Sequence, residues 1–282
     1  MVISVRSYAK INIFLHINGK RSDGYHDLQT LFAQTELHDT ITIDEADRTE
    51  LVCNVPEIPV DSSNLIIRVK DILSSRYGLK KKYSINLEKN IPSGGGMGGG
   101  SSNAACFLKA VNNMSDLGLS YCDMAEILGE IGSDTVYFLH NKPCYAEGRG
   151  EVIVSEAELP SVPLLLVNPN IHVPTGEIFG GGNLKLTAKA DLTRMPLVVG
   201  YEELLAMLDN GLEAAVFAKH PVLQILKTTL LDSGADGALM SGSGSTVFGI
   251  YRTDEQLSSA CSIIKEKFAD FTVFKSRIKG AG

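Results

Sequence analysis

The sequence predicts an α+β protein that folds as two domains. The chain has 282 residues, a length that suggests two domains, and strand-like and helix-like segments are mixed along it. Hydrophobic residues make up 44% of the composition, which is ample for a sizeable core. We expect an N-terminal domain over residues 1–155 and a C-terminal domain over residues 156–282.

Alternating or β-rich patterns predict the strands of the first half. They cover residues 4–17, 36–44, 49–55 and 83–92. A helix is predicted over residues 62–78, with Ser62 or Ser63 as its N-cap and Gly78 just past its end. Residues 120–132 form another predicted helix.

An amphipathic helix is expected after the glycine-rich stretch near residue 100. Four apolar residues recur there at positions i, i+3, i+4 and i+7. They are Ala104, Phe107, Leu108 and Val111.

The second half begins with a buried strand over residues 162–170, followed by a loop-like stretch over residues 176–196 that is rich in glycine and polar residues. Helices are then predicted by their apolar periodicity. They cover residues 201–217, 220–235 and 254–269. Two short strands around a Gly/Ser turn are expected within residues 237–251, and a last strand within residues 271–277.

Charge and hydropathy exclude several classes of function. The net charge of −7 argues against a general nucleic-acid binder, which needs a basic face. The N-terminal segment alternates and carries Arg6 and Lys10, so it is predicted to be a strand and not a signal peptide. No apolar run approaches the roughly 20 residues that span a bilayer. We therefore expect a cytoplasmic protein with neither a nucleic acid nor a membrane as partner.

The cysteines are odd in number, scattered and without a C-x-x-C pair, so neither a disulfide framework nor a zinc site is indicated. Buried free thiols are expected. The five are Cys53, Cys106, Cys122, Cys144 and Cys261.

The stretch "SGGGMGGGSS", residues 93–102, is the strongest local signal of function. It lies between a predicted strand and a predicted helix, whereas a flexible linker needs no ordered structure on either side. Such a unit directs backbone N–H groups and the positive end of a helix dipole at one point, which makes an anion site. Glycine lets the backbone approach phosphate oxygens, and Ser101 and Ser102 add hydroxyls at the first turn of the helix.

Two common phosphate motifs do not account for this stretch. Gly94, Gly96 and Gly99 satisfy G-x-G-x-x-G, but the match is nearly automatic in so glycine-rich a run, which also lies far from the first strand. The pattern G-x-x-x-x-G-K-[ST] fails, because Gly100 is followed by Ser101 and not by lysine. The charge that such a lysine provides must therefore come from elsewhere in the chain.

Five blocks of sequence together resemble the GHMP kinases, and among them the 4-diphosphocytidyl-2-C-methyl-D-erythritol kinases. The blocks follow one another in the family's order from residue 7 to residue 249. They read "SYAKINIFLHINGKRSDGYHDLQTLF", "IPSGGGMGGGSSNAA", "EIGSDTVYFLHNKPCYAEGRGE", "PTGEIF" and "MSGSGSTVFG".

This resemblance implies a fold and an activity. The expected fold is the two-domain GHMP kinase fold, with an N-terminal domain like ribosomal protein S5 domain 2 and a ferredoxin-like C-terminal domain. The expected activity is the ATP-dependent phosphorylation of the 2-hydroxyl of 4-diphosphocytidyl-2-C-methyl-D-erythritol, a step in non-mevalonate isoprenoid precursor biosynthesis. ATP and Mg²⁺ are the implied cofactors, the partners are small molecules, and a monomer or weak homodimer is expected.

The resemblance makes Lys10 and Asp134 the catalytic residues. Asp134 would act as the general base for the acceptor hydroxyl, and Lys10 would lie near it and the γ-phosphate. On residue type alone, a strand lysine is usually solvated and an aspartate after a helix often caps a turn. The family commonly has proline where Val136 stands, which leaves the local turn open.

The glycine stretch is expected to hold the ATP phosphates. Its residues are Pro92, Ser93, Gly94, Gly95, Gly96, Met97, Gly98, Gly99, Gly100, Ser101 and Ser102. No metal ligand is assigned, although Ser102 is a candidate for Mg²⁺. Asn64 and Lys89 are expected on the adenosine side.

The resemblance also implies the acceptor site. Tyr25 and Phe179 would sandwich the cytosine, and His26 would hydrogen-bond its edge. Further contacts are expected from Asn12, Thr175, Gly242 and Ser243. On residue type alone, an aromatic residue in a hairpin turn is ordinary. The remaining histidines are expected to be structural: His16, His38, His140, His172 and His220.

Two other functions stay open. Another GHMP kinase would act on homoserine, mevalonate or a sugar, and the "GYH" and "PTGEIF" blocks argue against it. A non-catalytic nucleotide-binding module would need neither Lys10 nor Asp134.

Overall fold

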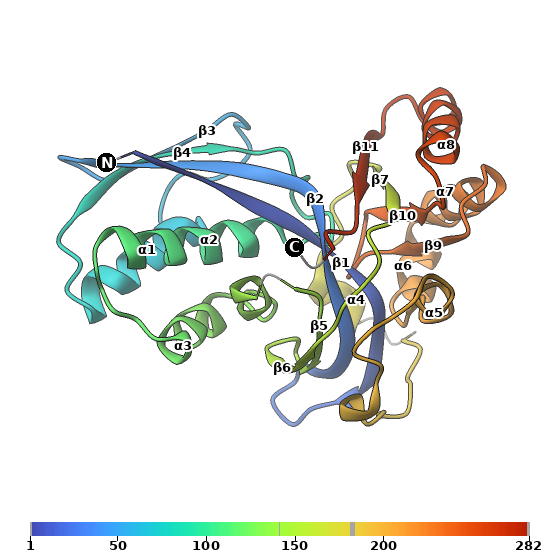
Figure 1. Cartoon of the computed structure of the whole chain (residues 1–282), viewed down its shortest axis with the longest axis horizontal. Coiled ribbons are helices and arrows are strands. Elements are labelled where there is room, and N and C mark those ends of the chain that lie inside the picture. The colour runs from blue at the N-terminus through green and yellow to red at the C-terminus, as the bar shows by residue number, and fades with distance from the viewer. Residues whose placement is uncertain (1, 141, 181–183, 281–282) are drawn as a thin grey trace. The chain divides into compact units, whose positions relative to one another are not determined.

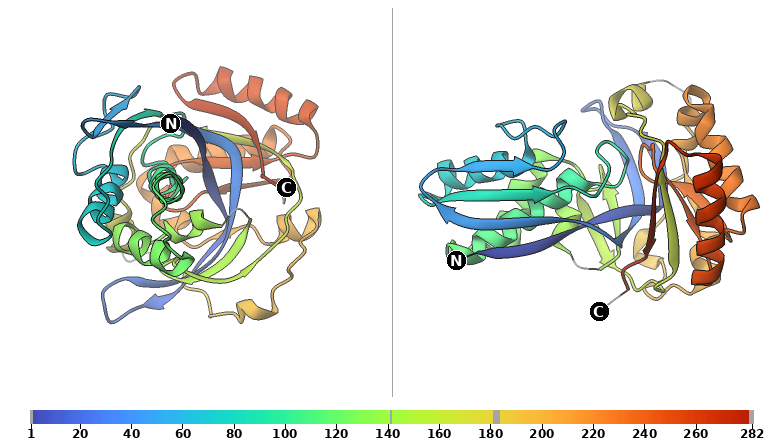
Figure 2. Two further views of the ribbon diagram at one scale, coloured as in Figure 1. Left: turned by 60° about the vertical axis from the view of Figure 1, so that its left-hand side comes forward. Right: turned by 90° about the horizontal axis from the view of Figure 1, so that it is seen from above.

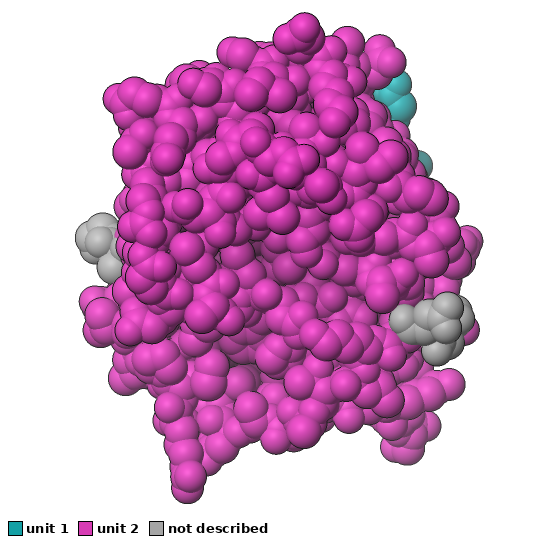
Figure 3. Space-filling view, turned by 90° about the vertical axis from the view of Figure 1, so that its right-hand side faces the viewer, with its two compact units in different colours: residues 1–9, 38–93, 98–140 teal, residues 10–37, 94–97, 141–282 magenta. Residues whose placement is uncertain are grey.

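The computed structural model describes residues 2–140, 142–180 and 184–280 (Figures 1 and 2). These residues form two compact units, which Figure 3 distinguishes by colour. Unit 1 comprises residues 1–9, 38–93 and 98–140, and unit 2 comprises residues 10–37, 94–97 and 141–282. Because the units interleave along the chain, they do not test a single cut between residues 155 and 156, which stays a prediction.

Two long strands, β1 (Ile3–Lys20) and β2 (His26–Ala46), run from one unit into the other. Both are longer than the sequence predicts. In unit 1, the second half of β2 pairs antiparallel with β4 (Lys82–Glu88), which pairs in parallel with β3 (Glu50–Cys53). The predicted strands of the first half are thus confirmed, and their alternating apolar residues are buried on one face.

Three helices cover this face of the unit 1 strands (Figures 1 and 2). They are α1 (Leu65–Arg76), α2 (Gly99–Met114) and α3 (Tyr121–Ile131). The four periodic apolar residues of α2 are all buried, which confirms the predicted amphipathic helix. This packing fixes where α2 begins, and therefore where the glycine stretch ends.

The predicted N-cap of α1 is wrong by one or two residues. The cap is Asn64, whose side chain accepts a hydrogen bond from the Ile66 N–H at 2.9 Å. Ser63 instead donates from both its backbone and its hydroxyl to Asp61, in a turn just before the helix. An amide oxygen that reaches the N2 amide caps as well as a serine hydroxyl does.

Unit 2 is built around a four-stranded sheet with the order β11-β7-β10-β9. Its strands are β7 (Pro163–Asn168), β9 (Gly237–Met240), β10 (Val247–Ile250) and β11 (Thr272–Arg277). All six residues of β7 are buried, as the apolar run predicts. The sheet packs against α6 (Glu213–Lys219), α7 (Pro221–Asp232) and α8 (Asp254–Lys267), whose apolar sides share its core.

Unit 2 also contains a hairpin that sequence patterns did not predict. Strands β5 (Cys144–Gly148) and β6 (Val152–Glu156) pair antiparallel, and β5 pairs with the first half of β2. The short strands lack a clear alternation, so only their pairing with β2 reveals them.

The continuous helix predicted over residues 201–217 is wrong. The chain forms α5 (Tyr201–Ala206), a two-residue strand β8 (Asp209–Asn210) and then α6. β8 pairs in parallel with β1 at Phe14 and Leu15. The Asn210-Gly211 dipeptide is a turn signal, and its strand pairing overrides the helical periodicity around it.

The loop-like stretch over residues 176–196 includes two short helical turns, α4 (Thr175–Gly180) and η2 (Leu192–Arg194), and its residues 181–183 lie outside the described residues.

All five cysteines are free thiols, but only Cys144 and Cys261 are buried and Cys122 is exposed, so the expectation of burial is wrong for the other three. Across the described chain no helix has the length and apolar character to cross a membrane.

Candidate active site

The glycine stretch adopts a backbone that only glycine tolerates well. Gly94, Gly96 and Gly98 have φ values of 67°, 76° and 66°, in the left-handed region. Alternating left-handed residues make successive N–H groups converge on one point, as in anion-binding nests. Gly98 is also the N-cap of α2 and supplies no side-chain cap, so an anion can satisfy the first N–H groups of the helix.

Three hydrogen bonds in unit 2 hold the carbonyl groups of this stretch. The Lys10 N–H donates to the Met97 oxygen at 3.0 Å, and the Thr246 N–H donates to the Gly95 oxygen at 3.2 Å. The Ser241 hydroxyl donates to the Gly96 oxygen at 3.0 Å. A Cβ atom on Gly96 would lie 2.1 Å from the Ser241 carbonyl oxygen, so no larger residue fits there without a backbone shift.

Lys10 is buried, with 5% of its surface exposed. Because strand side chains alternate, Lys10 and Asn12 share one face of β1. The Lys10 ammonium donates to Asn12 Oδ1 at 2.7 Å, and Asn12 Nδ2 donates to Thr30 Oγ1 at 2.8 Å. The ammonium also lies 5.3 Å from the centre of the Phe32 ring. Burial is costly for a charge, so this acceptor set fixes the direction of the lysine.

One predicted acceptor residue of the second half, Gly242, lies beside the Lys10–Asn12 pair in unit 2. A Cβ atom on Gly242 would lie 3.3 Å from Lys10 Nζ and 3.5 Å from Asn12 Oδ1, so both side chains lie next to the space beside Gly242. The next residue, Ser243, shares a hydrogen bond of 2.8 Å with the Thr175 hydroxyl at the start of α4.

The turn between β1 and β2 carries Tyr25 and His26. The Arg21 N–H donates to the Tyr25 oxygen at 2.8 Å, and Gly24 takes a φ of 87° to close the turn. Tyr25 is 56% exposed, and the Arg149 guanidinium lies 5.0 Å from its ring centre. The His26 ring lies 5.0 Å from the Phe179 ring of α4, at an interplanar angle of 30°.

His26 is a neutral imidazole at neutral pH. Burial of its ring lowers its pKa below the ordinary value of 6.5, and the positive charge of Lys20 lowers it further. A neutral imidazole can both donate and accept a hydrogen bond, which suits the edge of an uncharged base.

Asp134 lies in unit 1, just after α3. Its Oδ1 atom accepts a hydrogen bond of 2.8 Å from the Ser101 hydroxyl in the first turn of α2. The turn that follows, without the family's proline, is held by the Thr135 hydroxyl, which donates to the Leu128 and Gly132 oxygens at 2.6 Å each. A 3-10 turn, η1 (Val136–Leu139), begins directly after it.

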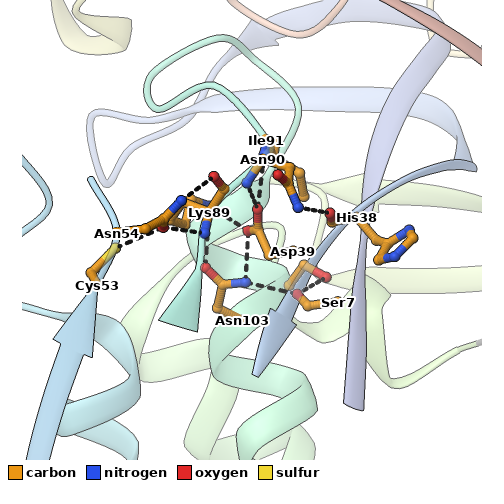
Figure 4. Close-up of polar contacts among 10 residues, drawn as sticks. Ser7, His38, Asp39, Cys53, Asn54, Lys89, Asn90, Ile91 and Asn103 are labelled. Atoms are coloured by element: carbon orange, nitrogen blue, oxygen red, sulfur yellow. Dashed lines mark hydrogen bonds and ion pairs between the residues drawn. The ribbon is translucent and has the colours of Figure 1, made fainter. Parts of the chain in front are cut away.

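Three residues predicted to bind nucleotide or metal already have partners in unit 1. The Lys89 ammonium pairs with Asp39 and contacts Asn103 (Figure 4). The Ser102 hydroxyl accepts from Ser7 at 2.7 Å and is 1% exposed, so Mg²⁺ binding there would require this pair to reorient. Asn64 caps α1 through its side-chain oxygen.

Most predicted site residues thus lie close to other predicted site residues of the same unit. Unit 2 brings together Lys10, Asn12, Thr175, Gly242 and Ser243, and places His26 beside Phe179. Unit 1 brings Ser101 to Asp134. The expected proximity of Lys10 and Asp134, which belong to different units, stays a prediction.

The sequence patterns missed one supporting residue of unit 2, Asn210. Its Nδ2 atom donates to the Met240 oxygen at 2.7 Å and to the Gly242 oxygen at 2.9 Å, and its Oδ1 atom accepts from the Leu212 N–H. It thereby fixes the backbone at Gly242, next to Lys10. The only signal in the sequence was the Asn-Gly turn inside an apparent helix.

Comparison with known families gives two matches. The GHMP kinases N terminal domain matches residues 64–142, and the GHMP kinases C terminal domain matches residues 200–270.

Curated relatives match nearly the whole chain. The 4-diphosphocytidyl-2-C-methyl-D-erythritol kinase of Syntrophotalea carbinolica is 37% identical over 262 residues, which are 92% of this chain and 93% of the relative. The enzyme of the same name from Bacillus cytotoxicus is 36% identical over 262 residues, 91% of each chain.

Solved structures agree with these relatives. A crystal structure of a 4-(cytidine 5'-diphospho)-2C-methyl-D-erythritol kinase has a TM-score of 0.81 and 26% identity, covering 99% of this chain and 100% of that chain. A homoserine kinase from Cytophaga hutchinsonii has a TM-score of 0.73 at 19% identity, covering 99% of this chain and 96% of its own, which shows the shared fold alone.

Proposed function

Because the chain belongs to the 4-diphosphocytidyl-2-C-methyl-D-erythritol kinase family of the GHMP kinases, we propose that it phosphorylates the 2-hydroxyl of 4-diphosphocytidyl-2-C-methyl-D-erythritol. The products are the 2-phosphate and ADP, in the non-mevalonate route to isoprenoid precursors. The observation that supports this best is the buried Lys10–Asn12 pair, which lies beside Gly242 in the same unit that carries Tyr25, His26 and Phe179. Unit 2 thus combines the fixed Lys10 ammonium with aromatic side chains that can stack on a nucleobase.

The ATP phosphates bind at the glycine stretch, residues 92–102. The left-handed glycines and the uncapped start of α2 supply N–H donors and a positive dipole without any lysine. Asn64 and Lys89 lie on the adenosine side of this proposed site.

Asp134 accepts the proton of the acceptor hydroxyl as its oxygen bonds to the γ-phosphorus. The bond from that phosphorus to the bridging oxygen breaks, and ADP leaves with the electron pair. Ser101 orients the carboxylate by donating to Oδ1. Lys10 offsets the negative charge that develops on the transferred group, a charge that must be stabilised in phosphoryl transfer.

Mg²⁺ accompanies ATP in this proposal and neutralises charge on its β- and γ-phosphates. Among the described residues, no group of three or more His, Cys, Asp or Glu side chains could hold a metal ion. With nucleotides, Mg²⁺ commonly keeps phosphate oxygens and waters as most of its ligands.

For the acceptor, Tyr25 and Phe179 hold the two faces of the cytosine, and neutral His26 reads its edge. Asn12, Thr175, Gly242 and Ser243 contact the remainder of the molecule. A cytoplasmic location and a monomeric or weakly dimeric state are further parts of the proposal.

An ADP-release assay over a panel of acceptors tests the function. The panel holds 4-diphosphocytidyl-2-C-methyl-D-erythritol, homoserine, mevalonate and a hexose, each with ATP and Mg²⁺. We expect turnover with the cytidyl compound. Turnover with one of the other acceptors instead would assign a different GHMP kinase activity.

The variant Asp134→Asn tests whether Asp134 is the general base of the reaction. It removes the proton acceptor but leaves the glycine stretch unchanged, so ATP binding should persist while kcat falls by about 10²- to 10⁴-fold. Isothermal titration with ATP and the ADP-release assay measure the two quantities. Turnover at the parental rate would show that Asp134 is not the base.

A further inference from the structure

Asp39 is a carboxylate on the buried face of a strand. It shares that face of β2 with Ile41 and Ile43, and it is 0% exposed. The register of β2 and β4 pairs Thr40 with Glu88, so Asp39 and Lys89 stand one position beyond the last paired residues. Opposite charges therefore meet at the end of β4, where the chain leaves the sheet toward the glycine stretch.

All four donors around this carboxylate come from segments next to the glycine stretch (Figure 4). Oδ1 accepts from the Asn90 and Ile91 N–H groups at 2.7 Å and 2.8 Å. Oδ2 accepts from the Lys89 ammonium and, at 2.9 Å, from Asn103 Nδ2. One side chain thus ties residues 89–91, before the stretch, to α2, after it.

The contact with α2 extends further into unit 1. Asn103 Oδ1 accepts from the Lys89 ammonium at 3.3 Å, and Asn103 Nδ2 also donates to the Ser7 hydroxyl at 2.9 Å. Ser7 in turn donates to Ser102 at 2.7 Å. A Cβ atom on Gly99 would lie 2.9 Å from Lys89 Nζ, so the first residue of α2 leaves no room for a side chain beside the Lys89 ammonium.

We propose that Asp39 is a positioning residue for nucleotide binding, acting through a loop clamp formed by Ser7, Asp39, Lys89 and Asn103. The clamp holds the end of β4 and the start of α2 in a fixed relation, which sets the directions of the N–H groups between them. In this proposal Ser7, Asp39 and Asn103 touch neither ATP nor the acceptor, and Lys89 is the one clamp residue that is also placed on the adenosine side. This inference rests on the proposed function, since it takes the glycine stretch as the phosphate site.

The test must separate positioning from folding. Removing Asp39 alone leaves a buried ammonium without its counter-charge, which destabilises the fold whatever its function. Removing both charges together avoids that problem. The informative variant is therefore Asp39→Ala with Lys89→Met, which leaves the remaining donors without an acceptor and introduces no unpaired charge.

For this double variant we expect the Kd and KM of ATP to rise about tenfold. This is the loss of affinity expected when the charge-assisted hydrogen bonds to the Asp39 carboxylate are removed. The KM of the acceptor should change by less than about twofold. Asp39→Asn with Lys89→Met keeps an acceptor for the Asn90 and Ile91 N–H groups and should recover part of the ATP affinity. Because both variants carry Lys89→Met, the difference between their ATP affinities reports on Asp39 and not on a direct contact of Lys89 with the nucleotide. A purely structural role would change the KM of both substrates alike.

Glu130→Gln is the control for the loss of an ion pair elsewhere in unit 1. It breaks the ion pair between Arg76 and Glu130, which lies in the same unit and contacts neither end of the glycine stretch. Its ATP affinity should equal that of the parent.

A parental ATP affinity in the Asp39→Ala/Lys89→Met variant would overturn the clamp, as would equal rises in the KM of ATP and of the acceptor. A parent that binds ATP but phosphorylates another acceptor would refute the proposed function and leave the clamp standing. If the parent binds no nucleotide, the positioning role falls with it. Hydrogen exchange at the Asn90 and Ile91 amides then shows whether the clamp still orders the backbone.

Discussion

His26 shows how a single side chain is adjusted by its surroundings. Its ring is half-buried against Phe179, and the charge of Lys20 lies nearby. Both burial and the nearby cation disfavour the imidazolium form. The residue is therefore a neutral hydrogen-bonding group at the pH of most cells.

The acceptor KM should consequently depend on pH through His26. It should be nearly constant from about pH 8 to about pH 7 and rise as the pH falls below 6.5, the ordinary pKa of histidine, because the lowered pKa means that half of the imidazole is protonated only below that value. The folded pKa is the lower one, so His26 also contributes stability that is present above that pH and lost below it. Initial rates against acceptor concentration at each pH measure the effect.

The variant His26→Gln provides the comparison, since glutamine keeps a donor and an acceptor but does not titrate. Its acceptor KM should be flat across the same range. An identical acidic rise in this variant would place the titrating group elsewhere.

At the scale of the element, the glycine stretch acts through its backbone, and its glycines differ in how strictly glycine is required at each position. Gly96 has a φ of 76°, and a Cβ atom there would lie only 2.1 Å from a neighbouring backbone oxygen. Gly100 lies inside α2, and a Cβ there would meet only Leu65 Cδ1, at 3.7 Å. Only the first of these glycines is required by both conformation and space.

Gly96→Ala should therefore lower the free energy of unfolding by about 2–3 kcal/mol and abolish tight ATP binding, because both the strained φ and the clash shift the backbone. Gly100→Ala should leave the free energy of unfolding within about 1 kcal/mol of the parent, toward higher stability, because alanine favours the helix. Urea unfolding and ATP titration measure the two effects. Equal stability losses in both variants would contradict this distinction.

At the scale of the whole molecule, the distribution of thiols reports on the fold. Cys144 and Cys261 are buried in unit 2, whereas Cys122 lies exposed at the start of α3 in unit 1. Burial raises the pKa of the Cys144 thiol to about 12, so it carries almost no reactive thiolate near neutrality.

Native protein treated with iodoacetamide at about pH 8 should be alkylated first at Cys122. Cys144 and Cys261 should react only at the rate at which the structure opens, and all five thiols should react in urea. Peptide mass spectrometry over time distinguishes the sites. Alkylation of Cys144 as fast as that of Cys122 would contradict the described burial.

Most regular elements could be predicted from local patterns, and the failures have physical causes. The apolar periodicity of α2 and the apolar run of β7 are strong and local, and both predictions are confirmed. The helix predicted over residues 201–217 is interrupted because Asn210 pairs with β1 and bonds the Met240 and Gly242 carbonyls. Periodicity carries no information about such distant partners.

The sequence by itself determined the glycine stretch, which is a local pattern of residue types, and the family, which follows from five blocks in the family's order. Lys10 and Asp134 became candidates through that resemblance. Only the tertiary structure decided that Lys10 is buried against Asn12, and that Asp39 and Lys89 tie together the two ends of the glycine stretch. Asp39 and Lys89 are 50 residues apart in sequence. Their contact depends on the register of β2 against β4, which is set by the packing of the sheet and not by either segment alone.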